Sequence, residues 1–182
     1  MGFAIAAAAA AAGHRVTLVS GPVALPTPPG VRRVDVVGAQ EMLRATLRAF
    51  RSSDALFMAA AVSDFRPTRR LRGKWRVKDR PGSTASLALT RNPDILAACG
   101  HDRARTGRLV VGFALETSDG ISRALRKMKR KNADFMVLND ERALNSPRAS
   151  VLILGGDGSV RSLENKSKAA IARELVALLG RP

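Results

Sequence analysis

The sequence predicts an α/β fold: a Rossmann-like, doubly wound and mostly parallel sheet with helices on both faces. Three observations lead to this prediction. Short, nearly continuously apolar runs alternate with segments of helical spacing, as expected for parallel strands that are covered on both faces. No repeat of fixed period is visible along the chain. No linker long enough to separate two domains occurs in the 182 residues, so we expect a single domain spanning residues 1–182.

The first sixty residues predict helices and strands in alternation. Phe3–Ala12 is almost entirely alanine, the strongest helix former, and Gly13 follows it as a stop. A proline-punctuated loop, residues 21–30, interrupts the strands. The remaining elements follow from apolar β-branched runs and from helical spacing: strands at Arg15–Ser20, Arg33–Val37 and Asp54–Ala60, and a helix at Ala39–Phe50.

From residue 61 onward the pattern changes. Residues 66–91, which we call the flap, carry turn residues and an alternation at Leu87 and Leu89 that predicts an extended arm or hairpin. Asn92-Pro93-Asp94 then predicts a helix that runs to about Cys99, with Asn92 as its cap and Pro93 in its first turn. The other predicted elements are strands at Arg108–Ala114 and Asp134–Leu138, helices at Thr117–Lys131 and Asn165–Leu179, and a C-terminal β-hairpin that begins with Ser150–Leu154.

The charge of the chain is strongly positive. Thirty-one Lys and Arg against 15 Asp and Glu give a formal net charge of +16, which attracts polyanions whatever the fold. Nucleic acid is therefore one candidate partner. Against it, the chain has no Tyr, one Trp and six Phe, which is a poor supply for stacking on single-stranded bases. The other interpretation is that the basic residues are scattered over loops and solvated helix faces.

The single cysteine and the absence of long apolar runs favour a cytoplasmic protein. Cys99 cannot form a disulfide within the chain, which fits a reducing compartment. No basic segment precedes the alanine-rich start, so we interpret it as a helix and not as a secretion signal. No apolar run approaches the roughly 20 residues needed to cross a bilayer. We therefore expect no association with a membrane.

Candidate site residues follow the predicted strands, because ligands of open α/β sheets bind beyond the carboxyl ends of the strands. Met58, Ala59 and Ala60 end a strand with small residues that let a ligand approach the backbone. Asp64 follows within a few residues and would bind a sugar hydroxyl or Mg²⁺, although an Asp that starts a turn gives the same pattern. Phe113, at another strand end, would either stack on a base or pack in the core.

Basic residues mark two further candidates. Alternation would place Lys74, Arg76 and Lys78 on one side of the flap, as in a polyphosphate site or in an edge strand protected by charge. A helix that starts at Pro93-Asp94-Ile95-Leu96 offers an anion site or a plain helix start.

A third basic set lies in the predicted helix Thr117–Lys131. Arg123, Lys127 and Lys131 stack like charges at a spacing of four residues, and a bound anion would offset their repulsion.

Other chemistries have little support in the sequence. His14 and His101 have no neighbouring Ser or Cys with an orienting acid, so a hydrolytic triad is not expected. The His and Cys residues lack metal-ligand spacing, and the glycines do not form a GxGxxG pattern after a strand. These observations argue against hydrolase, zinc and dinucleotide chemistry.

Taken in order, several segments resemble phosphopantothenoylcysteine synthetase, the ligase of coenzyme A biosynthesis. The segments are MGFAIAAAAAAAGHRVTLVSGPVALPTPPGV, AAAVSDFRP, GKWRVK, LALTRNPDIL, VGFALET and KMKRKNADFMVLND. The resemblance implies that 4'-phosphopantothenate and L-cysteine are joined with CTP and Mg²⁺ through an acyl-cytidylate. It also implies a homodimer in which each flap closes the partner's site. A decarboxylase domain, separate or fused, is a further implied partner, and no FMN is expected in this chain.

Carried onto matching positions, the resemblance implies specific roles. Met58, Ala59 and Ala60 would hold the base through their backbone, and Asp64 would lie at the nucleotide and its metal. Lys74 would be the catalytic cation that reaches the phosphates. The remaining implied nucleotide-binding residues are Pro93, Asp94, Ile95, Leu96 and Phe113 in the pocket wall and Lys127 and Lys131 on the triphosphate.

The chain departs from the family pattern in two places. The flap has Lys74-Trp75-Arg76-Val77 where the family shows a lysine-rich KIKK. Relatives also carry a strand and an Asn-x-Ser-Ser-Gly-Lys loop before the position of Met1-Gly2, and the 182 residues do not contain this loop. The resemblance therefore implies that the nucleotide half of the site is present, whereas the phosphopantothenate half is incomplete within these residues. The alternative that remains is a basic α/β module that binds nucleic acid or nucleotide without ligation.

Overall fold

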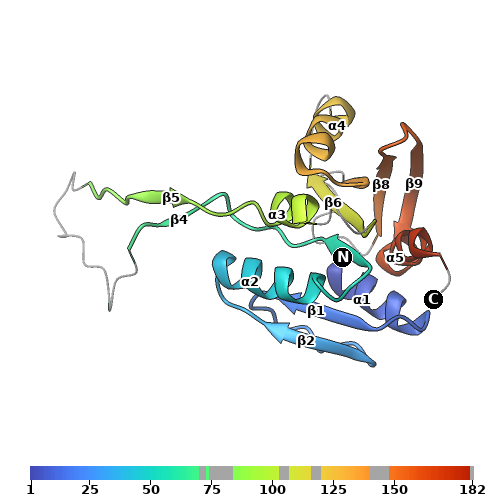
Figure 1. Cartoon of the computed structure of the whole chain (residues 1–182), viewed down its shortest axis with the longest axis horizontal. Coiled ribbons are helices and arrows are strands. Elements are labelled where there is room, and N and C mark those ends of the chain that lie inside the picture. Colours follow the sequence, from blue (N-terminus) through green and yellow to red (C-terminus); the bar gives the residue numbers. More distant parts are fainter. Residues whose placement is uncertain (70–72, 74–83, 103–106, 116–119, 140–147, 181–182) are drawn as a thin grey trace.

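The structure, a computed structural model, describes residues 1–69, 73, 84–102, 107–115, 120–139 and 148–180. The helices are α1 (Gly2–Ala11), α2 (Ala39–Phe50), α3 (Ile95–Asp102), α4 (Gly120–Lys131) and α5 (Lys168–Val176), which the 3-10 turn η3 (Ala177–Leu179) follows. The strands are β1 (Val16–Ser20), β2 (Val31–Asp35), β3 (Ala55–Met58), β4 (Phe65–Pro67), β5 (Leu89–Arg91), β6 (Leu109–Leu115), β7 (Phe135–Asn139), β8 (Arg148–Gly155) and β9 (Val160–Ser167). Strands and helices alternate along the chain, which confirms the predicted fold class (Figure 1).

The main sheet has five strands in the order β3-β6-β7-β8-β9. β3, β6 and β7 are parallel, whereas β8 and β9 form the predicted C-terminal hairpin and pair antiparallel. β1 and β2 form a separate parallel pair, so the described strands do not make the single continuous sheet that we expected. The reason is that no described strand lies between β1 and β3 to accept and donate the backbone hydrogen bonds that would join them.

Helices cover both faces of the main sheet, and the strand residues alternate between them. On one face, Val110 of β6 and Met136 of β7 pack in a cluster with α2, α3 and α4. On the other face, Val111 of β6 and Val137 of β7 pack with α1 and α5. All four side chains are at most 1% exposed. This alternation explains why the parallel strands look almost continuously apolar in the sequence.

Several element ends differ from the sequence-based boundaries by one or more residues, and polar contacts accompany two of these differences. The sequence predicts Val37 in a strand, but β2 ends at Asp35 and the Val37 side chain is 81% exposed. The Val37 N–H donates to Glu41 Oε2 at the entry to α2 and not to a neighbouring strand. Asn165 was assigned to the last helix but belongs to β9. That helix begins after Ser167, whose hydroxyl accepts a hydrogen bond from the Ala170 N–H.

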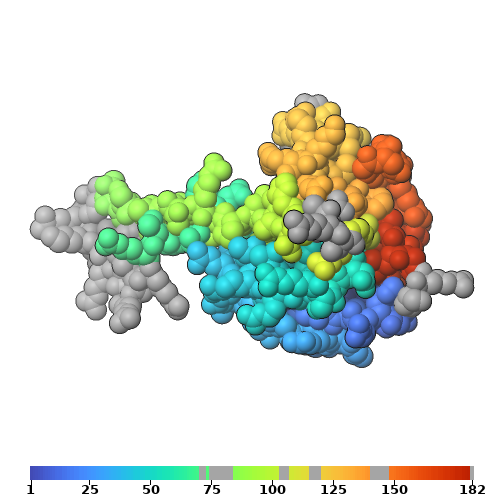
Figure 2. Space-filling view, viewed as in Figure 1, coloured from blue at the N-terminus to red at the C-terminus, as the bar shows by residue number. Residues whose placement is uncertain are grey.

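The described ends of the flap, residues 66–69 and 84–91, lead away from the body of the molecule, as the sequence predicts (Figure 1). β4 and β5 pair antiparallel at its base, from Phe65 opposite Arg91 to Pro67 opposite Leu89. In the space-filling view, the coloured atoms of β4 and β5 extend away from the rounded body of helices and sheet (Figure 2). Within the described part of the chain, no helix combines the length and the apolar character required to cross a membrane.

Candidate functional site

The carboxyl end of β3 meets the start of α1. Met58 is the last residue of β3 and packs against the cluster formed with α2, α3 and α4. Ala59 turns the chain back, with its N–H donating to the Phe57 carbonyl at 3.2 Å. A Cβ atom built on Gly2 would lie 3.7 Å from Ala59 Cβ, so the first turn of α1 reaches this strand end. Two small residues thus follow the end of β3, Ala59 half-buried and Ala60 exposed.

Asp64 lies in the loop that leads from β3 into the flap. Its side chain is exposed, and no described residue forms a hydrogen bond or an ion pair with its carboxylate. The loop around it is held by its neighbours: Ser63 Oγ donates to the Phe65 carbonyl at 2.9 Å. The Asp64 carbonyl in turn accepts from the Asn92 N–H at 2.8 Å. Hydrogen bonds thus hold the backbone around Asp64, whereas its carboxylate has no partner among the described residues.

Asn92 ties the two chain segments at the base of the flap together. Its Nδ2 donates to the Ser63 carbonyl at 2.8 Å, and its Oδ1 accepts from Arg66 Nη1 at 3.1 Å. The same Arg66 nitrogen donates to the Arg91 carbonyl at 2.6 Å. These bonds join four residues from β4, β5 and the positions just beside them, and we call Arg66 and Asn92 the flap lock. The helix-start pattern of the sequence does not predict this role of Asn92, although Asn before Pro is a turn signal that favours it.

The start of α3 differs from the prediction in its capping residue. Asn92 was expected to cap the helix, but it points back to Ser63, and Asp94 takes the capping position instead. Asp94 Oδ1 accepts from the Ala97 N–H at 3.0 Å. Pro93 accordingly precedes the helix and does not lie in its first turn. The physical reason is that the residue before proline is biased toward extended backbone, which delays the helix start.

Ile95 and Leu96 follow the cap and are 2% and 5% exposed. Their side chains belong to the core, so only their backbone is available to a ligand. Leu96 packs directly over β6 at Gly112, where an added Cβ atom would lie 2.5 Å from Leu96 Cδ2. The same Cβ atom would lie 3.1 Å from Met136 Cε. Glycine at position 112 therefore lets α3 approach the sheet closely.

α4 supplies a dense set of cations beside α3. Its buried side, Ala124 and Met128, packs against the core, and its sequence contains no acidic residue. Lys131, at the end of α4, places Nζ 3.3 Å from Asp94 Oδ2. Two residues predicted for the nucleotide site are thus in contact, although 37 positions separate them in the numbering. The cations of α4 are Arg123, Arg126, Lys127, Lys129, Arg130 and Lys131.

Phe113 does not share a face with Ile95 and Leu96. It is half-buried and packs against the cluster formed by α1, α5 and the C-terminal hairpin, on the other side of the sheet. Neighbouring residues of a strand point to opposite faces, so Gly112 faces Leu96 and Phe113 faces away. The structure therefore does not bring these side chains into one pocket wall. Lys74, the predicted catalytic cation, lies outside the described residues.

The cysteine can be excluded as a nucleophile at neutral pH. Cys99 is fully buried in α3. Burial, assisted by the negative charge of Asp102, raises the pKa of its thiol to about 11. The thiol therefore stays protonated and takes the role of a small apolar core residue.

No group of three or more His, Cys, Asp or Glu side chains suited to hold a metal occurs among the described residues. Mg²⁺ does not require one, because it keeps several waters and is held by one or two carboxylates together with substrate phosphates. The Asp64 carboxylate is exposed and has no partner among the described residues, which fits such a nucleotide-borne ion.

Comparison with known proteins gives one family for nearly the whole chain. Residues 1–181 match the family "DNA/pantothenate metabolism flavoprotein C-terminal domain". The chain is 38% identical over 183 residues to the coenzyme A biosynthesis bifunctional protein CoaBC of Vibrio cholerae, covering 98% of the chain and 45% of that protein. It is 39% identical over 184 residues to a cysteine/cysteine sulfinic acid decarboxylase from an unknown prokaryotic organism, covering 97% of the chain and 49% of that protein. The chain thus spans about half the length of the curated relatives that it matches.

Solved structures show the same fold. The crystal structure of the C-terminal domain of coenzyme A biosynthesis bifunctional protein CoaBC superposes with a TM-score of 0.80 at 33% identity, covering 98% of this chain and 79% of that one. A mutant of Cab2 in complex with phosphopantothenate-cysteine superposes with a TM-score of 0.60 at 18% identity, over 82% of this chain and 53% of that one. The predicted resemblance is confirmed: the chain belongs to the family of the DNA/pantothenate metabolism flavoprotein C-terminal domain.

Proposed function

We propose that the chain carries the ligase that joins 4'-phosphopantothenate to L-cysteine in coenzyme A biosynthesis, in the cytoplasm. The observation that carries this proposal is the family match over residues 1–181. Further support comes from the bifunctional coenzyme A proteins among its relatives and from a structure of similar fold that holds phosphopantothenate-cysteine. A decarboxylase, fused or separate, would act on the product.

The reaction proposed has two steps. The carboxylate of 4'-phosphopantothenate attacks the α-phosphorus of CTP, which forms an acyl-cytidylate and releases pyrophosphate. The amine of cysteine then attacks the acyl carbon, which forms the amide and releases CMP and a proton. Both steps bring several negative charges together, so fixed cations are what the protein must supply.

The geometry of the described residues suits the nucleotide part of this reaction. The backbone at Ala59 and Ala60 is open at the strand end and would hold the base, next to Met58. Lys127 and Lys131 would bind the triphosphate from α4, next to the first turn of α3, where backbone N–H groups favour an anion. Lys74 would add a charge from the flap.

Asp64 would face the nucleotide and its Mg²⁺ with the carboxylate that has no described partner. Mg²⁺ would supply charge neutralisation on the phosphates. The flap lock would keep the Asp64 loop at a fixed position relative to the start of α3.

We also propose a homodimer in which flaps are exchanged. β4 and β5 lead away from the body of the molecule (Figure 1), and large apolar side chains on and beside these strands are exposed: Phe65, Leu87 and Leu89 are 47%, 50% and 54% exposed. A second subunit would cover them. Analytical ultracentrifugation is expected to give a dimer, and a monomer at all concentrations would contradict it.

One observation favours a second candidate function, the binding of nucleic acid. α4 carries six cations and no acidic residue, as expected for a surface that neutralises phosphates. Thermal unfolding separates the two functions. The ligase predicts stabilisation by CTP with Mg²⁺, about 2.7 kcal/mol at a hundredfold excess over Kd, and none by duplex DNA. Stabilisation by duplex DNA that disappears at high salt, without a CTP effect, would support the second function instead.

A further inference from the structure

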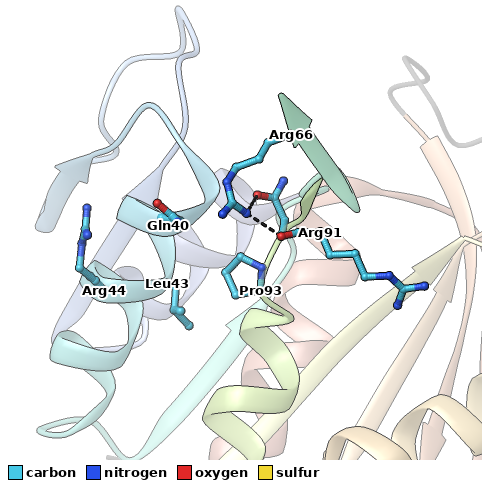
Figure 3. A pocket seen from close by; sticks show the side chains of 7 residues that line it. Gln40, Leu43, Arg44, Arg66, Arg91 and Pro93 are labelled. Carbon is cyan, nitrogen blue, oxygen red and sulfur yellow. Dashed lines mark hydrogen bonds between the residues drawn. The ribbon is translucent and has the colours of Figure 1, made fainter. Parts of the chain in front are cut away.

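A pocket of about 460 Å³ lies between α2 and the base of the flap (Figure 3). α2 contributes one wall, and the residues around the flap lock contribute the other. This volume falls within the range of small-molecule sites. The lining residues are Gln40, Leu43, Arg44, Arg66, Arg91, Asn92 and Pro93.

Arg66 is the fixed cation of this pocket. Its Nη1 donates to the Arg91 carbonyl at 2.6 Å and to Asn92 Oδ1 at 3.1 Å, as the dashed lines in Figure 3 show. Both acceptors are neutral, so they orient the guanidinium without cancelling its charge. A guanidinium has five N–H donors, and these two bonds engage a single nitrogen, which leaves donors for a ligand.

Arg44 and Arg91 stand on opposite sides of Arg66, one on α2 and the other on β5, and their guanidinium groups extend outward (Figure 3). Both side chains are exposed. No described carboxylate forms an ion pair with any of the three arginines of the pocket. The acid next to the pocket on α2, Glu41, directs Oε2 to the N–H groups of Val37 and Gly38.

Three like charges around one cavity repel each other, and an anion between them would replace this repulsion with attraction. Guanidinium groups bind phosphate oxygens in a bidentate manner, which favours a phosphate over a simple halide. Leu43 and Pro93 add apolar surface beside the cations, which suits the organic part of a phosphorylated molecule.

We propose that this arginine pocket binds a phosphorylated small molecule through its phosphate group. Arg66 receives the phosphate inside the pocket, and Arg44 and Arg91 turn inward from the two sides. The inference does not require the ligase reaction. Only Pro93 is shared with the candidate nucleotide site, so the phosphate has two conceivable sources, a nucleotide that reaches across Pro93 or a separate molecule.

Inorganic pyrophosphate is the probe, titrated calorimetrically into the full chain at fixed ionic strength. We expect Arg44→Gln and Arg91→Gln each to weaken its binding about tenfold, as for the loss of one charge-assisted hydrogen bond. Arg48→Gln is the matched control, since Arg48 is exposed one turn further along α2 and does not line the pocket. Arg66 is left intact because its hydrogen bonds hold the flap.

Equal binding by the wild type and both pocket variants would overturn the proposal, as would a wild type that does not bind pyrophosphate. An equal loss in Arg48→Gln would also overturn it, because it would show a general effect of charge. Competition between CTP and pyrophosphate identifies which molecule supplies the phosphate group. Displacement of pyrophosphate by CTP assigns the phosphate to a nucleotide, and simultaneous binding assigns it to a separate ligand. If CTP still stabilises the pocket variants, the absence of pyrophosphate binding at this pocket contradicts only the pocket proposal and not the proposed ligase function.

Discussion

Lys131 Nζ lies 3.3 Å from Asp94 Oδ2, and this ion pair joins the end of α4 to the start of α3. The other oxygen of Asp94 caps α3 through the Ala97 N–H. Asp94 therefore both starts the helix and neutralises a cation that is proposed to bind phosphate. A triphosphate that approaches this helix start has to compete with Asp94 for Lys131.

Asp94→Asn is expected to strengthen CTP binding by about 0.5–1 kcal/mol, because it frees Lys131 and removes a negative charge near the phosphates. The Asn oxygen still accepts from Ala97, so stability should fall by less than about 1 kcal/mol. Lys131→Gln should weaken CTP binding. Calorimetric titration measures both changes. Weaker CTP binding by Asp94→Asn would show that the carboxylate itself contacts the ligand.

Gly112→Ala is expected to destabilise the fold by about 1–3 kcal/mol, because the new methyl group collides with Leu96 and Met136. Urea unfolding measures the loss. Gly156→Ala is the matched control, since its added Cβ atom would lie 3.5 Å from the Asp134 carbonyl, an ordinary contact. The double variant Gly112→Ala with Leu96→Ala should lose less than the sum of the two single losses. Strict additivity would contradict the close approach of α3 to β6.

Asn92→Ala removes the two hydrogen bonds of the Asn92 side chain and leaves the bond from Arg66 Nη1 to the Arg91 carbonyl in place. The loop that carries Asp64 then keeps its backbone hydrogen bond from the Asn92 N–H but loses the side-chain bond at the Ser63 carbonyl. We therefore expect weaker CTP binding, by about 1–3 kcal/mol, with a smaller change in unfolding free energy. Asn92→Asp keeps the acceptor for Arg66 and should fall between the wild type and Asn92→Ala. An Asn92→Ala variant that binds CTP like the wild type would mean that the lock does not position the site.

Cys99 gives a prediction that depends on pH. Its thiol pKa is raised from 9.0 to about 11 by burial, so the folded protein keeps this proton where the unfolded chain releases it. The sign follows: this contribution to stability is complete below pH 9 and is lost progressively between pH 9 and about 11. Cys99→Ala should flatten the decline of the unfolding free energy over that window. Rapid labelling of the native thiol at pH 8 would contradict the burial.

Most helices and strands could be predicted from the sequence because residue propensity, apolar spacing and turn residues within each segment indicated the same element. Val110 and Val111 are adjacent, lie on opposite faces of the sheet and are both apolar. Adjacent apolar residues are the sequence pattern of a strand that is covered on both sides. The alanine-rich run became α1 almost to the residue. Ser167 capped the last helix as its residue type favours, although the helix began later than predicted.

Long-range relationships were not predictable from the same signals. The Asn92 side chain could bind either an N–H group in the first turn of α3 or the Ser63 carbonyl, which lies 29 positions earlier. Only the folded chain shows that it binds the Ser63 carbonyl. The Lys131–Asp94 contact depends on how α4 packs beside α3, which helical spacing does not determine. The position of Phe113 behind the sheet depends on the register of β6, which a continuously apolar strand does not reveal.

The ligase proposal is tested most directly by incubating the full chain with 4'-phosphopantothenate, L-cysteine, CTP and Mg²⁺ and following the products by mass spectrometry. We expect phosphopantothenoylcysteine as the product, with one CMP and one pyrophosphate formed for each amide. Omission of cysteine should leave the acyl-cytidylate. A chain that binds CTP but forms neither the acyl-cytidylate nor the amide would contradict the proposed function.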